Sequence, residues 1–168
     1  MPAGATYEPI ATTTLGSSAS SVTFSSISGA YTDLILVITA KSTIGNTDNY
    51  IRFNGDTANN YSTTWLTGNG SAATSGRESN QAGILLDYGA YLKTTGFTLC
   101  IVQIMNYSNS TTYKTVLTRS NDANTGVDAL VGLWRKTPEA ITSLTLDPVG
   151  TQGLEAGSTF TLYGIAAA

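Results

Sequence analysis

The spacing of apolar segments along the chain is the strongest constraint on its fold. These segments are short and rich in Thr, Val, Ile, Tyr and Phe, and Gly, Asn, Ser or Asp interrupts them about every ten residues. No stretch shows the helical period of about 3.6 residues. We therefore predict an all-β chain whose strands span residues 6–14, 20–27, 33–41, 49–53, 63–67, 83–87, 97–106, 113–120, 129–136, 141–147 and 158–165.

Two strand patterns predict where each strand lies in its sheet. Apolar residues alternate with hydroxyl residues in the segments 22–24, 142–146 and 159–162, as expected when one face packs on a core and the other meets water. The runs 34–38 and 99–104 are apolar on both faces. Those two strands should be central, with the outer side covered by another chain, a loop or a second layer, so we expect a subunit interface there.

Many short antiparallel strands in one small chain predict a β-sandwich or jelly-roll-like fold, because these architectures limit exposed strand edges. We predict a single domain over residues 11–168, preceded by an extended amino-terminal arm, residues 1–10. Pro9 cannot donate a hydrogen bond to a sheet, so its strand should be an edge or an arm that reaches a neighbour. The polar segment 68–82 is expected to be a surface loop and a candidate contact.

Charge is sparse, and this limits the classes of partner. The chain has 45 Ser and Thr residues but only 8 basic and 11 acidic residues, and it has no histidine. The basic residues are scattered, so we expect no nucleic-acid partner. The longest apolar run is too short to span a membrane and no signal peptide is evident, so we expect synthesis in the cytosol and no membrane association. Cys100 is the only cysteine and lies in an apolar run, which predicts a buried, inert thiol.

The sequence offers little to catalysis. The absence of histidine excludes the usual zinc sites and Ser-His-Asp or Cys-His catalysis. The carboxylates fall mostly in predicted turns, so we expect no enzyme, no catalytic residue and no cofactor. One weak calcium candidate has oxygen-bearing side chains at Asp122, Asn124 and Asp128, but a hairpin turn is the favoured interpretation of this segment.

Aromatic residues are the best contact candidates. Tyr and Trp bury a large area while offering a polar tip, so they suit both cores and interfaces. Trp134 should pack inward. The others could serve either role, and we name as candidate partner contacts Tyr7, Pro9, Tyr61, Trp65, Tyr88 and Tyr91.

Several segments resemble a known group of proteins. They are YEPIATTTL at 7–15 followed by VTF at 22–24, VQIMNY at 102–107, TYKTV at 112–116, VGLWR at 131–135 and the ending GSTFTLYGI at 157–165. Together they resemble small virion structural proteins of tailed bacteriophages, especially those that infect cyanobacteria. The ending is the most distinctive part of the resemblance.

The resemblance implies a place on a virus particle and supplies no catalytic residues. The expected function is that of a capsid decoration, or cement, protein that binds the outer capsid surface as a homotrimer and stabilises contacts of the major capsid protein. The alternative is a receptor-binding or carbohydrate-binding module at a tail or fibre tip, where related β-sandwich modules also occur.

Overall fold

The computed structural model describes residues 6–45 and 47–166, and strands are the only regular elements that these residues form. The strands are β1 (Tyr7–Thr14), β2 (Val22–Phe24), β3 (Asp33–Ala40), β4 (Asn49–Phe53), β5 (Tyr61–Gly68), β6 (Ala73–Gln81), β7 (Ile84–Leu85), β8 (Thr98–Met105), β9 (Lys114–Asp122), β10 (Gly126–Trp134), β11 (Leu144–Pro148) and β12 (Thr159–Ile165).

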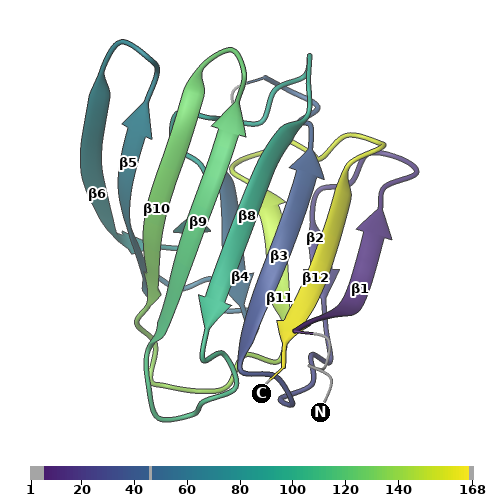
Figure 1. Ribbon diagram of the computed structural model, residues 1–168, viewed down its shortest axis with the longest axis vertical. Coiled ribbons are helices and arrows are strands. Elements are labelled where there is room, and N and C mark those ends of the chain that lie inside the picture. The colour runs from purple at the N-terminus through teal and green to yellow at the C-terminus, as the bar shows by residue number, and fades with distance from the viewer. Residues whose placement is uncertain (1–5, 46, 167–168) are drawn as a thin grey trace.

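The strands form two antiparallel sheets. An eight-stranded sheet has the order β1-β12-β3-β8-β9-β10-β5-β6, and a four-stranded sheet has the order β2-β11-β4-β7. Figure 1 shows the large sheet in front, with β2, β11 and β4 behind its middle. The predicted all-β class and single β-sandwich domain are therefore confirmed.

The core lies between the two sheets, and strand alternation builds it. Leu34 and Leu36 of β3 and Val102 and Ile104 of β8 are fully buried, and they meet the apolar side of the small sheet. The one-sided strands behave as predicted, since every second residue of β2, β11 and β12 is buried. Burying apolar side chains in this way is the main driving force for folding.

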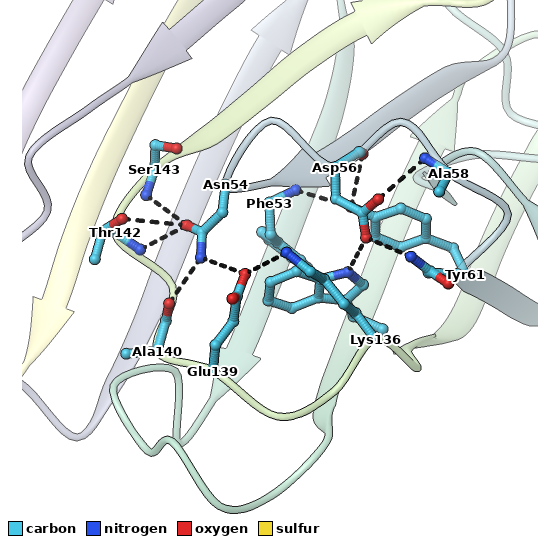
Figure 2. Close-up of polar contacts among 12 residues, drawn as sticks. Phe53, Asn54, Asp56, Ala58, Tyr61, Lys136, Glu139, Ala140, Thr142 and Ser143 are labelled. Carbon is cyan, nitrogen blue, oxygen red and sulfur yellow. Dashed lines mark hydrogen bonds and ion pairs between the residues drawn. The ribbon is translucent and has the colours of Figure 1, made fainter.

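A polar network joins the two sheets at one end of the core (Figure 2). The turn after β4 places Asn54 in the left-handed backbone region, and its side-chain oxygen accepts bonds from the N–H groups of Thr142 and Ser143 before β11. Two residues on, the carboxylate of Asp56 accepts the indole N–H of Trp134 in β10 at 2.7 Å. Trp134 is buried, as predicted, and packs between Tyr61 and Phe53.

Several strand predictions were wrong in extent. The predicted loop 68–82 is instead a tight turn followed by β6, which pairs with β5 along its whole length. β5 begins earlier than predicted, at Tyr61. The segments 20–27, 83–87 and 141–147 contribute shorter strands because their ends turn away from the ladders.

The amino-terminal segment forms an edge strand from Tyr7 onward. Among the described strands β1 pairs only with β12, and its register shifts between Pro9 and Ala11, where the proline interrupts the ladder. This confirms the edge position expected for Pro9. Residues 1–5 of the predicted arm lie outside the described residues, and the arm's contact with a neighbour stays a prediction.

Candidate contact face

The large sheet has one side on the core, and no layer formed by residues 6–45 or 47–166 covers its other side. The outward-pointing side chains of β3, β8, β9, β10 and β5 form a surface that we call the outer face. Alternation requires these positions to lie opposite the buried ones. The most exposed apolar members are Leu66, Leu99, Leu117, Val127, Val131 and Leu133, with exposed fractions between 38% and 59%.

The outer face includes the outward side of the two runs, 34–38 and 99–104, that are apolar on both faces and for which we expected a subunit interface. β3 and β8 are central in the large sheet, which confirms their expected position. No described part of the chain packs over Leu99 or Leu117, each 39% exposed. Contiguous exposed apolar patches on soluble proteins commonly mark binding surfaces.

Arg119 stands at the middle of the outer face. Three hollows of about 530, 480 and 350 Å³ surround it, and Ile101 and Arg119 line all three. The third hollow also reaches Asp33 and Tyr7, toward the amino-terminal edge of the sheet. Among the described residues, none makes an ion pair or hydrogen bond with the Arg119 guanidinium.

Two predicted contact residues lie beside this face. Tyr7 is well exposed, and its ring meets the ring of Tyr163 edge-on at 6.4 Å. Pro9 pairs with Tyr163 across the β1–β12 ladder. Both residues are therefore placed where a partner on the outer face could reach them.

The remaining aromatic candidates have different positions. Tyr61 is fully buried and belongs to the core, so it offers no contact surface. Trp65 stacks on Tyr88 with ring centroids 3.6 Å apart. A side chain at Gly76 would lie 2.3 Å from Cζ2 of Trp65 and 2.8 Å from both neighbouring ring atoms, so the indole rests on the Gly76 backbone. Both faces of the indole are covered, and Trp65 is not an open platform for a sugar.

Tyr91 is the last of these candidates and is half-buried. The ammonium group of Lys93 lies 5.6 Å from the centre of its ring. This contact leaves part of the phenol exposed, and Tyr91 lines none of the three hollows on the outer face.

The three calcium candidates do not converge on one point. Asp122 accepts bonds from the N–H of Asn124 and the hydroxyl of Thr125, which closes the β9–β10 hairpin. Asp128 points into the fold, where one carboxylate oxygen accepts the N–H groups of residues 88, 89 and 90 at 2.8–2.9 Å. The structure forms the hairpin, and no three acidic or cysteine side chains among residues 6–45 and 47–166 are grouped as a metal site.

Two more carboxylates, those of Asp48 and Asp87, lie near Asp128 at its end of the core. Asp87 is buried and accepts bonds from the backbone and side chain of Asn49, and burial raises its pKa well above the usual range. Burial, followed by the charges of Glu78 and Asp128, raises the pKa of Asp48 to about 6. Asp87 therefore holds the segment after β7 against the start of β4, and the sequence did not single out Asp48 or Asp87 for any role.

Sequence reasoning found the outer face but missed Arg119 and Asp33. In the sequence each of them is marked only by its charge at an outward position. Asp33 begins β3, a strand that is apolar on both faces, and Arg119 lies on β9, the neighbour of the other such strand, β8.

Among the described residues there is no helix with the length and apolar character needed to cross a membrane.

Comparisons with known proteins add little. No family model matches the chain, and no curated protein matches it. The solved structure of a double mutant of the alginate lyase Aly36B, in complex with an alginate trisaccharide, is similar over 86% of this chain and 80% of that chain. Its sequence identity is 9% and its TM-score is 0.27, a likeness too small to support an argument.

Proposed function

We propose that this chain is a structural protein of a bacteriophage virion that decorates the outer surface of the capsid as an oligomer. The observation that carries the proposal is the outer face, an extended apolar surface that the described residues leave uncovered. An interface core is depleted in charged residues, and this face has one charge at its centre. The resemblance of the segments 7–15 and 157–165 to phage virion proteins supports the location.

The geometry favours binding over chemistry. The hollows on the outer face are open and mostly apolar, and the carboxylates of Asp87 and Asp128 are turned into the fold to accept bonds from its own N–H groups. A decoration protein acts by mass action: because it binds the assembled shell and not the free subunits, each bound copy stabilises the shell. Many weak contacts in one lattice then add up to a strong effect.

Copy number in purified particles tests this proposal. Quantitative gel densitometry or mass spectrometry against the major capsid protein should find this chain in hundreds of copies per virion. A few to tens of copies would instead support the alternative of a tail or fibre-tip module. Absence from purified virions would reject both locations.

A further inference from the structure

The outer face has two charges of opposite sign at separate places. Arg119 lies on β9, and Asp33 begins β3 on the same side of the sheet, because Leu34 points to the core. Both residues line the hollow of about 350 Å³. Arg77 of β6 lies farther out, at the rim.

Within one chain these two charges are too far apart to pair. Ile101 of β8 lies opposite both Arg119 and Val37, and Asp33 comes four residues before Val37 in β3. The Cα atoms of Arg119 and Asp33 are therefore two strands apart across the sheet and four residues apart along the strands, a separation of about 16 Å. The carboxylate of Asp33 accepts the N–H of Asn106 through one oxygen, and no ion pair with any described residue engages the other.

We infer that a second copy of this chain covers the outer face, with Arg119 of one copy facing Asp33 of its neighbour. The inference rests on the proposed function, in which the chain acts as an oligomer, and names the surface that joins the copies. A guanidinium buried in an apolar contact needs a carboxylate opposite it, since an unpaired buried charge is strongly unfavourable. The face supplies that carboxylate itself, so it is complementary to a turned copy of itself.

The outward side of the whole large sheet is big enough for such a contact. The outer face and the flanking strands β1, β12 and β6 together make eight strands of seven to nine residues, a sheet of about 34 Å by about 26 Å, or roughly 900 Å². A stable protein interface buries about 800 Å² on each partner. The apolar side chains at the centre, such as Leu117 and Val131, would then leave water, and the threonine-rich strand edges would form a polar rim.

Charge exchange tests the pairing. We would measure the molar mass of the full chain by size-exclusion chromatography with light scattering, over a range of protein concentrations. The wild type should be oligomeric, and Arg119→Asp and Asp33→Arg should each weaken association at least tenfold through like-charge repulsion. The double variant, which combines Arg119→Asp with Asp33→Arg, should regain most of the lost affinity because it restores each ion pair with the two charges exchanged.

Three further variants keep the test decisive. Asp33→Asn retains an acceptor for the N–H of Asn106, so it removes the charge even if Asp33→Arg unfolds the chain. Val131→Asp should also dissociate the oligomer. Ile44→Asp should not, since Ile44 is even more exposed (52% against 43%) but lies in the loop between β3 and β4. Thermal unfolding of each variant separates dissociation from loss of fold.

The outcomes separate this inference from the proposed function. A monomeric wild type, or single variants that remain fully oligomeric, would overturn the inference whatever the copy number in virions. A monomer that loses capsid binding on Arg119→Asp would show that a capsid protein, and not a second copy, covers the face. An oligomer held by these pairs but absent from virions would leave the inference standing and remove the capsid role.

Discussion

At the residue scale, the acidic side chains near one end of the sandwich serve the fold. Asp128 binds three consecutive N–H groups, and Asp87 binds Asn49 twice. Asp48 differs, because one of its carboxylate oxygens is buried without a hydrogen-bond partner. A carboxylate in this position favours the protonated form, and burial with nearby negative charge raises its pKa to about 6.

This raised pKa predicts a pH-dependent effect of Asp48→Asn. A carboxyl whose pKa is raised in the folded state costs stability as pH rises from its unfolded pKa, about 3.9, to its folded pKa, and the cost then stays constant. The variant should be more stable than the wild type by about 1 kcal/mol at pH 8, after allowing for solvent screening of a half-exposed group. At pH 4 the difference should be a small fraction of its value at pH 8, because the pH is then close to the unfolded pKa. Urea unfolding at both pH values measures it, and an equal gain at pH 4 would contradict the charge explanation.

At the element scale, β6 shows how a polar segment becomes an edge strand. Its sequence contains few good strand formers, and it is held by the backbone ladder to β5 and by the indole of Trp65 lying over Gly76. Covering an edge glycine with an aromatic ring from the next strand stabilises such an edge. The charged side chains of Arg77 and Glu78 disfavour pairing of another strand with the free edge of β6.

Substituting Gly76 tests this arrangement. In Gly76→Ala the new methyl group would meet the Trp65 ring at 2.3 Å, so the indole must move, and we expect a loss of roughly 1–3 kcal/mol in unfolding free energy. The tryptophan fluorescence should shift to longer wavelength as Trp65 becomes wetter. Gly68→Ala is the matched control, since its nearest atom would be 3.9 Å away. Equal losses in the two variants would show that the indole contact has no special role.

At the scale of the whole molecule, the two sheets close one core around Cys100. The thiol is buried, as predicted, and burial raises its pKa well above the usual range, with Asp87 and Asp128 adding to the shift. It lines a small internal cavity of about 20 Å³ with Asn49 and Leu146. A reagent therefore reaches it only when the sheets separate.

Thiol labelling should thus report unfolding of the whole sandwich. Under native conditions Cys100 should react with a thiol reagent only as fast as the chain opens globally, and at once in high urea. The free energy of opening from labelling should match that from urea unfolding measured by circular dichroism. Rapid labelling of a chain that is otherwise folded would show that the sheets open locally at this point.

The strand pattern along the chain determined the all-β class, the central positions of β3 and β8, the edge position of Pro9 and the inward side of Trp134. These depend on alternation and proline chemistry, which are local properties of the backbone. They required no knowledge of which strands pair.

Only the tertiary structure decided the roles that depend on distant partners. β6 is a strand because β5 lies beside it, and Tyr61 is core because Phe53 and Trp134 surround it. Arg119 and Asp33 share one face because β8 brings β3 and β9 together. Pairing between strands far apart in the sequence is set by packing of the whole molecule, and short polar or ambiguous segments have no local signal for it.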